Sequence, residues 1–475
     1  MTMMRLSEAA RALSAQLRGE DQAFDAVSTD SRALAPRALF VALKGERFDG
    51  HDFLREAAKR HAAGALVQDS VTRAQTPEAL PLLVVENTRL ALGRLAAYWR
   101  HRFSMPLVAL TGSNGKTTVK EMLALILRER ATSERRDADA TSCVLATRGN
   151  LNNDIGVPLT LLELRRDHRY AVVEMGMNHA GEIRYLTQLA APDVALVNNV
   201  GPAHIEFFGS VEAIARAKGE IFEGLGPEGT AVINADDRHA PILRELAAAR
   251  KRIEFGLESK VAVTAAYKLR FLESEIALRT PLGEAAAILK APGLHNVRNA
   301  LAASAAAVAL KVPAATIAAG LGRFAGVKGR LQYRTAVSGA TLIDDTYNAN
   351  PESARAAIGV LGRAPGEKLL VLGDMGELGA DTAALHAEIG SAARAQGVDR
   401  LYTVGELSAR AARAFGSGAR HFERVEELIA EVEKRLAPAV TVLVKGSRFM
   451  RMERIVNALA LPGEERGVRR EEASR

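Results

Sequence analysis

The sequence of 475 residues predicts a mixed α/β protein built from three domains. Apolar runs typical of strands alternate with segments whose apolar residues recur at helical spacing, which indicates mostly parallel sheets covered by helices. A chain of this length exceeds a single hydrophobic core, so several domains are expected. We place them at residues 1–85, 86–326 and 327–475, with a frayed, charged tail at 463–475.

The first domain is predicted from a short alternation of strands and helix. The expected strands are Leu39–Leu43, Ala65–Val67 and Leu82–Val85, and the expected helix is Asp52–His61. A helical segment, Thr88–Arg102, follows, and Pro106 ends it because proline cannot continue a helix.

The central domain continues the alternation. Strand Leu107–Leu110 leads into helix Val119–Arg130, and residues 131–142 are polar and predict a loop. Further strands are expected at Tyr170–Glu174, Val194–Asn198 and Ala231–Asn234, a β-rich stretch at 261–290, and a buried helix at Asn299–Leu310.

A linker at 324–330 precedes the third domain. Its expected strands are Thr341–Asp344, Lys368–Leu372, Arg400–Val404 and Thr441–Val444. Helical segments separate these strands, so a second parallel sheet is expected. In such sheets, ligands bind at the carboxyl ends of the strands, and the most polar segments of this chain follow predicted strands there.

Composition narrows the function classes. The chain has 63 Lys and Arg against 56 Asp and Glu, a net charge of +7, and residues of both signs are interspersed. This pattern predicts no nucleic-acid-binding surface but is compatible with small anionic substrates. The single cysteine, Cys143, excludes an intrachain disulfide and is interpreted as a core residue. Neither a signal peptide nor a membrane-spanning apolar run is visible, so we expect a cytoplasmic enzyme without membrane insertion.

The segment Thr111–Thr118 is the strongest functional motif. It joins a predicted strand to a predicted helix and contains Gly112, Ser113, Asn114, Gly115, Lys116, Thr117 and Thr118. Its glycines let backbone N–H groups approach phosphate, Lys116 can neutralise that phosphate, and the Thr117 hydroxyl can ligate Mg²⁺. The general phosphate-loop pattern has glycine where Leu110 stands, so the spacing here is shorter. The alternative is an ordinary glycine turn before a helix.

Three residues beyond the loop are candidates for a metal site. Glu174 ends a predicted strand and can hold Mg²⁺ directly or through water, or it can be a surface carboxylate. His204 also follows a strand; Mg²⁺ prefers oxygen ligands, so His204 can bind the metal, orient a metal-bound water or be structural. The ammonium of Lys218 has no lone pair, so its chemistry alone indicates a surface lysine or a substrate clamp.

The third domain contributes two polar segments. Asp344–Pro351 contains Asp345, Tyr347, Asn348 and Asn350, which suits a ribose or adenine contact and hydrogen bonds to a substrate, or an Asx-rich turn. Lys445–Arg448 follows a later strand, and the guanidinium fork of Arg448 suits a carboxylate.

Together these residues resemble the ATP-dependent Mur ligases, through nearly the whole chain and in matching order. The resemblance rests on Thr111–Thr118, Ser28–Arg32, Leu43–His51, Tyr347–Pro351 and Leu372–Gly379. The last two segments are similar to those of the family members that add D-alanyl-D-alanine. The resemblance implies a small UDP-binding first domain, a P-loop-type ATPase domain and a Rossmann-like C-terminal ligase domain.

The resemblance also implies roles for individual residues. The implied catalytic residues are Lys116, Glu174, His204 and Lys218. Nucleotide contacts are implied for the phosphate loop and for Asn296, Arg330, Asp345 and Tyr347. Substrate contacts are implied for Ser31, Arg32, Lys44, Gly45, Asp49, His51, Asn150, Asn152, Asn153, Asn348, Asn350 and Arg448. Metal ligands are implied at Thr117, Glu174, His204 and Lys218, the last as a carbamate, which turns a cation into an oxygen ligand.

The implied reaction forms an amide bond. ATP, with Mg²⁺, phosphorylates the terminal carboxylate of UDP-N-acetylmuramoyl-tripeptide, and the amine of D-alanyl-D-alanine attacks the acyl phosphate. The products are UDP-N-acetylmuramoyl-pentapeptide, ADP and phosphate, in peptidoglycan precursor synthesis. The resemblance implies a monomer. It leaves open whether the third residue of the tripeptide is lysine or diaminopimelate.

Two other readings remain at this point. One is a related ligase, of the folylpolyglutamate synthetase type or another Mur ligase, which the segment Tyr347–Pro351 argues against. The other is a non-catalytic nucleotide-binding regulator or a P-loop motor. The combination of Thr117, Glu174 and Lys218 opposes a regulator, and a motor would need the longer glycine spacing.

Overall fold

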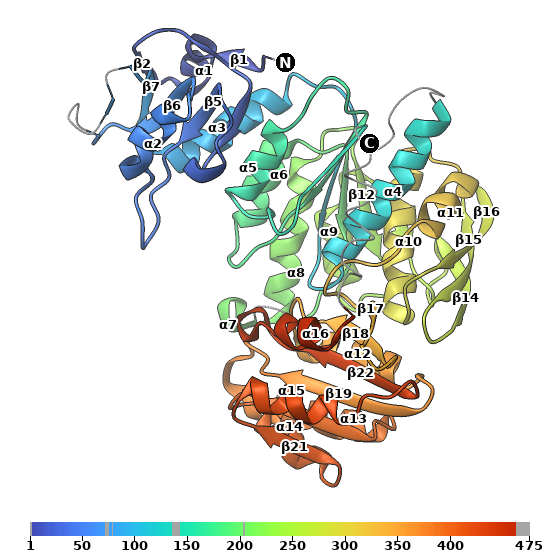
Figure 1. Ribbon diagram of the computed structural model, residues 1–475. Helices are drawn as coiled ribbons and strands as arrows, with labels where there is room; N and C mark the ends of the chain where they lie inside the picture. Colours follow the sequence, from blue (N-terminus) through green and yellow to red (C-terminus); the bar gives the residue numbers. More distant parts are fainter. Residues whose placement is uncertain (1, 72–75, 78, 135–142, 203–204, 462–475) are drawn as a thin grey trace.

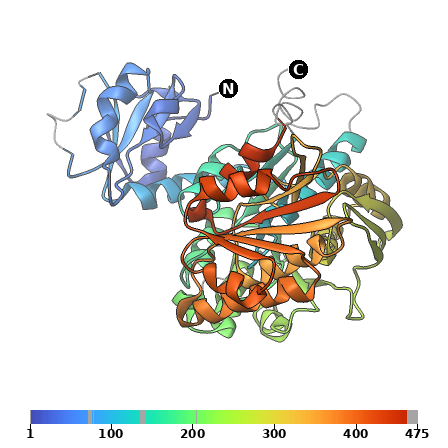
Figure 2. The ribbon, with the colours of Figure 1, turned by 60° about the horizontal axis from the view of Figure 1, so that its bottom comes forward.

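The computed structural model describes residues 2–71, 76–77, 79–134, 143–202 and 205–461. The chain forms an N-terminal, a central and a C-terminal α/β unit, each around its own mostly parallel sheet (Figure 1). Turning the molecule shows the N-terminal unit standing to one side of the other two (Figure 2). The predicted fold class is confirmed.

The N-terminal unit has a sheet that is parallel except for its first edge strand. In order across the sheet, the strands are β2 (Gln16–Arg18), β7 (Leu82–Val85), β6 (Gly64–Gln68), β5 (Ala38–Val41) and β4 (Ala26–Ser28). A small ribbon and the helical segments around the sheet are β1 (Met4–Arg5), β3 (Ala23–Phe24), α1 (Leu6–Leu13), η1 (Ser31–Ala33), η2 (Gly50–Phe53) and α2 (Leu54–Lys59). Helix α3 (Thr88–Arg100) leads into the central unit.

The central sheet is entirely parallel. Its strands, in order, are β13 (Lys251–Phe255), β12 (Thr230–Asn234), β11 (Val194–Val197), β8 (Leu107–Thr111), β10 (Tyr170–Glu174) and β9 (Val144–Ala146). Its helical segments are α4 (Lys116–Glu134), α5 (Gly156–Leu162), α6 (Glu182–Ala190), α7 (Ile205–Phe208), α8 (Val211–Gly219), η4 (Glu220–Gly224) and α9 (Ala240–Leu246).

An antiparallel sheet and two helices complete the central unit. They are β14 (Thr264–Leu269), β15 (Ser274–Thr280), β16 (Gly283–Leu289), α10 (Leu294–Ala309) and α11 (Ala314–Gly322). Alanine-rich helix α10 is buried along most of its length, because small side chains let it pack closely between the parallel sheet and the antiparallel one.

The C-terminal sheet is parallel except for β17. Its strands, in order, are β17 (Gln332–Thr335), β18 (Thr341–Asp345), β22 (Val440–Lys445), β19 (Glu367–Gly373), β20 (Arg400–Val404) and β21 (Ala419–Phe422). Its helical segments are α12 (Pro351–Leu361), η5 (Gly379–Asp381), α13 (Thr382–Ala395), α14 (Ala409–Phe415), α15 (Val425–Glu433), η6 (Arg448–Met450) and α16 (Glu453–Leu459).

The alternation of side chains along the strands divides the core. In β8, Leu107 and Ala109 enter an apolar cluster that continues through α3 into the N-terminal unit, whereas Val108 and Leu110 face α4 and α10 on the other side. The C-terminal sheet is covered in the same way on both faces by clusters of its own. Because the strands of the central sheet are all parallel, their carboxyl ends lie at one edge, where the phosphate loop begins.

Most predicted elements are confirmed, and one is wrong. Residues 131–134 are helical rather than part of a loop, because α4 continues to Glu134. Residues 135–142, the predicted tail at 463–475 and His204 lie outside the described residues. The domain boundaries at 85/86 and 326/327 stay predictions.

Candidate active site

A cleft of about 1780 Å³ lies at the carboxyl ends of the central strands and is closed from the far side by the C-terminal unit. It is lined by the phosphate loop, the segment after β10, the start of α10 and the segment after β18. This is the position at which open parallel sheets bind ligands, and the volume exceeds that of a single drug-sized pocket. The cleft can hold more than one substrate.

The phosphate loop has the backbone that its glycines predict. Strand β8 ends at Thr111 and α4 begins at Lys116, so the loop delivers its N–H groups at a helix N-terminus. Gly115 has φ 78°, and a Cβ there would lie 2.3 Å from Asn299 Oδ1, so only glycine fits. Asn114 N donates to Asn199 Oδ1 at 2.8 Å, which fixes the loop against the segment after β11.

Lys116 is held back along its own loop. Its Nζ donates to Gly112 O at 2.7 Å. Burial lowers the pKa of Lys116, Glu174 opposes the shift, and Arg330 adds to it. The ammonium thus lies in a polar cleft beside another cation, which an anionic ligand such as a phosphate would neutralise.

Thr117 and Glu174 form the centre of the candidate metal site. Both are buried, and Thr117 Oγ1 donates to Glu174 Oε2 at 2.9 Å. Asn152 Nδ2 donates to Glu174 Oε1 at 2.8 Å, so both carboxylate oxygens are fixed, and Thr147 Oγ1 accepts from the backbone N–H of Glu174. The predicted position of Glu174 across from Thr117 is present, and the contact of Asn152 with Glu174 is an addition to it.

Lys218 lies at the edge of the same cleft, near the end of α8. Its residue is 2% exposed, and among the described residues it has no hydrogen-bond or ion-pair partner. Burial, with the charge of Lys116, holds the pKa of Lys218 well below its ordinary value. Both effects disfavour the charged form, so this amine loses its proton more readily than that of an exposed lysine.

The residues present fit Mg²⁺. Among the described residues no group of three or more His, Cys, Asp or Glu side chains is placed to hold a metal, so a closed, all-protein site is not found there. Mg²⁺ instead binds through one or two carboxylates and substrate phosphates and keeps waters. The buried Glu174 carboxylate and the Thr117 hydroxyl beside a phosphate loop are such a set.

Asparagine side chains connect the floor of the cleft. Asn198 Nδ2 donates to Asn114 O and to Asn299 Oδ1, both at 2.9 Å. Asn299 Nδ2 donates to Asn296 Oδ1 at 3.2 Å, and Asn296 Nδ2 donates to Pro292 O at 2.8 Å. This chain of buried amides joins the phosphate loop to the start of α10, where the nucleotide contact of Asn296 is predicted.

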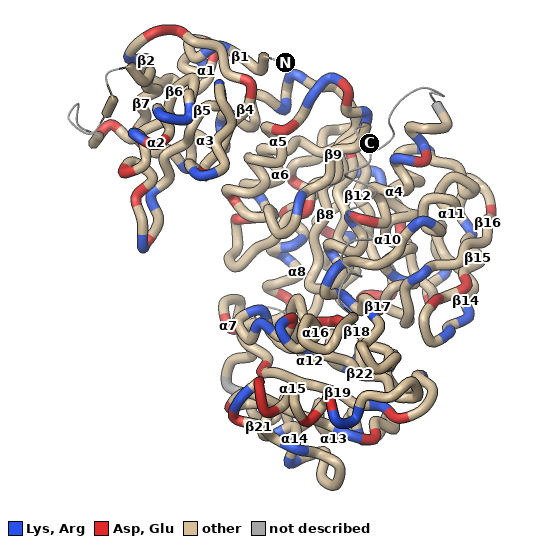
Figure 3. The backbone as a smooth tube through the Cα atoms, viewed as in Figure 1, with Lys and Arg blue, Asp and Glu red and all other residues tan. Residues whose placement is uncertain are grey.

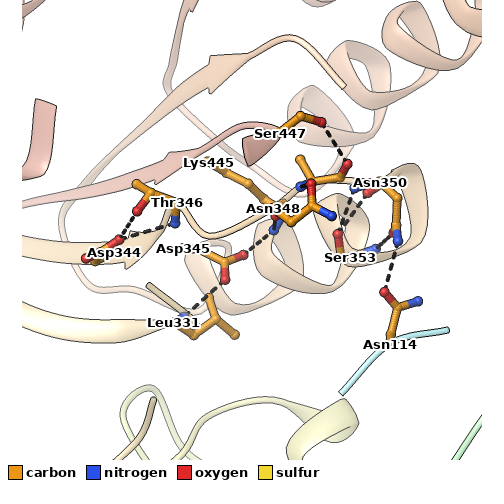
Figure 4. A network of polar contacts seen from close by, with 11 residues as sticks. Asn114, Leu331, Asp344, Asp345, Thr346, Asn348, Asn350, Ser353, Lys445 and Ser447 are labelled. Atoms are coloured by element: carbon orange, nitrogen blue, oxygen red, sulfur yellow. Dashed lines mark hydrogen bonds and ion pairs between the residues drawn. The ribbon is translucent and has the colours of Figure 1, made fainter. Parts of the chain in front are cut away.

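The C-terminal unit reaches the phosphate loop through polar side chains. Arg330 Nη2 donates to Thr117 Oγ1 at 3.1 Å, and its guanidinium lies 4.2 Å from the centroid of the Tyr347 ring. Asn350 Nδ2 donates to Asn114 Oδ1 at 2.9 Å (Figure 4), and Asn114 Nδ2 donates to Glu352 Oε2 at 2.7 Å. The structure thus brings the predicted nucleotide and acceptor residues together.

The predicted substrate residues of the N-terminal unit lie outside this cleft. Ser31, Arg32, Lys44, Gly45, Asp49 and His51 are all absent from its lining. Arg32 is exposed and pairs with Asp30. His51 is buried: its Nδ1 contacts Asp49 Oδ1 at 2.5 Å and its Nε2 accepts from Gln68 N at 3.0 Å. Both ring nitrogens of His51 are engaged, so it holds the loop that carries Lys44 and Asp49.

The remaining predicted substrate residues line the cleft. They are Asn150, Asn152, Asn153, Asn348, Asn350 and Arg448. Asn153 Oδ1 also accepts from Ile155 N and Gly156 N, which fixes the start of α5. Arg448 is exposed at the C-terminal wall and pairs with Glu453 at 3.2 Å.

Glu352 was not selected from the sequence, and Asn198, Asn299 and Lys445 were noted within polar segments without a role of their own. Asn198, Asn299, Glu352 and Lys445 line the cleft as well. Asn198 and Lys445 stand at the carboxyl end of a strand, so the position of ligand sites in parallel sheets was a signal for both. Asn299 and Glu352 lie inside helices, and only the tertiary packing brings them to the loop.

Charges of both signs are spread over all three units rather than gathered on one face in this view (Figure 3). Among the described residues, none of the helices combines the length and the apolar character needed to span a membrane.

Family models match most of the chain. The Mur ligase middle domain matches residues 110–307, the glutamate ligase domain of Mur ligases residues 329–448, and the domain named "Mur ligase family, catalytic domain" residues 23–100. The match to the middle domain begins at the last part of β8 and contains the phosphate loop, Glu174 and Lys218.

Relatives and solved structures agree with these models. The UDP-N-acetylmuramoyl-tripeptide–D-alanyl-D-alanine ligase of Escherichia coli (strain K12) is 44% identical, over 97% of this chain and 99% of that protein. The ligase of the same name from Haemophilus influenzae is 40% identical, over 96% and 99%. A crystal structure of MurF from Acinetobacter baumannii matches with a TM-score of 0.87, 37% identity and coverage of 96% and 98%. The MurF ligase of Thermotoga maritima in complex with ADP matches with a TM-score of 0.79, 28% identity and coverage of 91% and 96%. The chain therefore belongs to the Mur ligase family.

Proposed function

We propose that this protein is an ATP-dependent ligase that joins the terminal carboxylate of UDP-N-acetylmuramoyl-tripeptide to the amine of D-alanyl-D-alanine. The observation that carries the proposal is the meeting of two groups across one cleft. One side of the cleft carries Lys116, Thr117 and Glu174, and the other side carries the segment Asn348–Asn350. Asn350 forms a hydrogen bond with the phosphate loop. The names of the relatives at 44% and 40% identity support the same reaction.

The chemistry follows from where the charges lie. ATP supplies the phosphoryl group that activates the tripeptide carboxylate. An oxygen of that carboxylate bonds to the γ-phosphorus and ADP leaves; the amine then attacks the acyl carbon, and phosphate leaves with that oxygen. Two anions must approach each other in the first step, so the positive charges of Lys116 and Arg330 at the phosphate loop would reduce their repulsion.

A carbamate on Lys218 is part of the proposal. A neutral amine is the form that adds to CO₂, and burial, which lowers the pKa of Lys218, favours that form. The product carries a carboxylate-like group, which Mg²⁺ accepts as a ligand together with Thr117 and Glu174. We assign His204 to the same metal site from the family resemblance.

Each part of the two substrates is assigned to one unit of the protein. The UDP group is proposed to bind the N-terminal unit through Ser31, Arg32, Lys44, Gly45, Asp49 and His51. The tripeptide would then extend along Asn150, Asn152 and Asn153 toward the phosphate loop. Asn348, Asn350 and Arg448 would take D-alanyl-D-alanine, with its carboxylate on Arg448. We propose a cytoplasmic monomer that needs no nucleic acid.

The other readings are weaker. Folylpolyglutamate synthase of Mycobacterium tuberculosis matches at 17% identity, which supports the shared fold alone. A regulator without catalysis would not need Thr117, Glu174 and a buried amine at one position. A motor would hydrolyse ATP without an acceptor peptide, which a single assay separates from a ligase.

The test is phosphate release by the purified protein. ATP, Mg²⁺, UDP-N-acetylmuramoyl-tripeptide and D-alanyl-D-alanine are supplied and omitted one at a time, and the product is weighed by mass spectrometry. We expect release that needs all four and a mass gain of one D-alanyl-D-alanine less water. Release without the dipeptide, or a better reaction with another amine, would move the protein to a sister ligase or a nucleotide hydrolase.

A further inference from the structure

A buried lysine of the C-terminal unit, Lys445, has no role in the function proposed above. It ends β22, its residue is 2% exposed, and it lines the cleft. Its Nζ donates to Asp345 Oδ2 at 2.5 Å and to Asn348 O at 2.9 Å. One ammonium therefore holds two residues that belong to different parts of the site (Figure 4).

The sheet dictates this meeting. Strands β18 and β22 are parallel neighbours, and their last residues, Asp345 and Lys445, stand opposite each other in the register. Side chains that are opposite in neighbouring strands share a face, so the Asp345 carboxylate and the Lys445 ammonium are placed to form a pair. The chain leaves β18 at Asp345 and turns directly into Tyr347–Asn350, which brings Asn348 O back over the end of β22.

The first partner belongs to the nucleotide side of the cleft. Asp345 is 8% exposed, and its second oxygen accepts from Leu331 N at 3.1 Å, one residue after Arg330. Lys445 and Leu331 thus fix both oxygens of Asp345 between them. Arg330 and Tyr347, the other predicted nucleotide contacts of this unit, flank that carboxylate.

The second partner belongs to the acceptor segment, which we define as Asn348–Asn350. Two residues beyond Lys445, Ser447 Oγ donates to Ala349 O at 3.1 Å in the same segment. Ser447 Oγ also accepts from Gly376 N at 2.8 Å, in the turn after β19. Lys445 and Ser447 therefore hold the acceptor segment at two consecutive carbonyls. Of these two residues, Lys445 also bonds Asp345.

We propose that Lys445 is a positioning residue that couples the nucleotide side of the cleft to the acceptor segment. This inference rests on the proposed ligase function, in which the activated carboxylate and the amine must meet within reacting distance. A fixed Asp345 places the nucleotide, and a fixed Asn348 carbonyl places the segment that receives the dipeptide. Lys445 sets both positions from one atom, so they cannot drift independently.

The strength of the effect follows from burial. Removing one member of a buried ion pair leaves the other charge without compensation, which costs far more than an exposed pair is worth. Without Lys445, the Asp345 carboxylate would lose its charged partner, and Asn348 O would lose its donor. Both substrates would then bind to a site that has to be reordered first.

The experiment separates the two partners by their Michaelis constants. In Lys445→Met we expect the KM for ATP and the KM for D-alanyl-D-alanine each to rise about tenfold or more. In Asp345→Asn only the KM for ATP should rise by that much, because Lys445 keeps its bond to Asn348 O. In Ser447→Ala only the KM for D-alanyl-D-alanine should rise, about fivefold, because a neutral hydrogen bond is lost.

A second substitution covers the case in which Lys445→Met does not fold. Lys445→Gln keeps a donor for Asn348 O but cannot neutralise Asp345, so it should raise the KM for ATP and leave that for D-alanyl-D-alanine near the wild-type value. The matched control is Lys368→Met, at the opposite end of neighbouring β19, where the lysine is paired with Asp399. Both of its KM values should equal those of the wild type.

Lys445→Met and Asp345→Asn should also be non-additive in the KM for ATP when combined, since they act through one pair. Lower thermal stability with unchanged KM values, or a change in kcat alone, would overturn the inference. If the wild-type enzyme released phosphate without needing D-alanyl-D-alanine, the proposed function would fail instead. The KM for ATP would still test the nucleotide half of the coupling in that case.

Discussion

At the scale of single residues, the site works by holding groups that would repel one another until substrates arrive. Lys116 lies near Glu174 and Arg330, Lys218 lines the same cleft near Lys116, and burial lowers the pKa of both lysines. Phosphate groups would neutralise the cations of this site, and a metal ion would neutralise the Glu174 carboxylate. Two predictions follow from this arrangement.

Lys116→Ala removes the cation beside the phosphate loop. We expect turnover to fall about a hundredfold or more, because the loss acts on charge that develops in the transition state. The circular dichroism spectrum and unfolding temperature should stay close to those of the wild type, since Lys116 bonds only its own loop among the described residues. Lys268→Ala, an exposed lysine on β14, is the control with normal turnover. Normal turnover of Lys116→Ala would contradict the phosphate-loop assignment.

Lys218→Ala tests the carbamate. Activity should be lost and then partly restored by added formate or acetate, because a free carboxylate can occupy the space where the carbamate oxygen would lie. The same salts should not rescue Lys116→Ala, which lacks a cation rather than an anion. Full activity of Lys218→Ala would remove this residue from the metal site.

Residue identity could be predicted better than residue contact. The phosphate loop, Glu174 and Asn350 were found from motif and position after a strand, because local sequence dictates both. The pairing of Lys445 with Asp345 and the bond from Asn350 to Asn114 join residues 100 and 236 positions apart. No local pattern encodes such distances, and they depend on the strand order.

At the scale of elements, the buried strands were predictable and the exposed edge strands were not. Tyr170–Glu174 and Arg400–Val404 are mostly apolar strands that are buried almost throughout, and their bounds are those predicted. β2, β13 and β21 have mixed polar residues, because one face or one edge meets water, and they were missed. α10 begins at Leu294, five residues before the predicted start, since polar His295 and Asn296 belong to its first turn.

Helix α1 shows how an element can be capped from a distance. Its N-cap residue, Arg5, makes no side-chain cap, but Asp21 accepts from Ser7 N at 2.9 Å and from Ser7 Oγ at 2.8 Å. Arg5 Nε also donates to Asp21, and its hydrogen bond, with those of Ser7, lowers the pKa of Asp21 from 3.8 to about 2. The carboxylate thus satisfies one of the free N–H groups at the start of the helix, that of Ser7.

Asp21→Asn should therefore lower the unfolding temperature at neutral pH, and the effect should depend on pH. Because the folded-state pKa of Asp21 lies below the unfolded value, its stabilisation is complete above pH 3.8 and is lost as the pH falls through about 2. The difference between wild type and variant, followed by thermal unfolding from pH 6 to pH 2, should shrink only at the acidic end. A difference that stayed constant over this range would contradict the assignment.

At the scale of the whole molecule, the two outer units are attached in different ways. An apolar cluster runs without a break from the N-terminal sheet through α3 to the central sheet, and Arg165 Nη2 donates to Asp25 O at 3.0 Å across that boundary. The C-terminal unit has apolar clusters of its own. It meets the central unit through the aromatic pair of Phe271 and Tyr333 and through polar bonds at the phosphate loop.

This difference makes the C-terminal unit the part that can move. Polar contacts between units are exchanged with water at little net cost, whereas a shared apolar core is not. Phe271 and Tyr333, which follow the central unit and the linker in the chain, would act as the pivot, and the hydrogen bonds of Asn114 would fasten the C-terminal unit to the phosphate loop. Glu352 approaches so closely there that a Cβ on Gly201 would lie 2.6 Å from its Oε2.

Asn114→Ala removes the hydrogen bonds to both Asn350 and Glu352. Each is worth about 1 kcal/mol, so the balance between closed and open arrangements of the ligand-free protein should shift by a factor of about five to thirty toward open. Small-angle X-ray scattering should record a larger radius of gyration, and saturating ATP should restore the wild-type value. Gly201→Ala, which displaces only the end of the Glu352 side chain and leaves the bond from Asn350 to Asn114, should give a smaller increase. Arg394→Ala, which breaks a bond to Ser417 within the C-terminal unit, should leave the radius unchanged. Identical scattering curves for all these proteins would mean that the units are held by their pivot alone, and that the polar bonds at the loop follow closure without contributing to it.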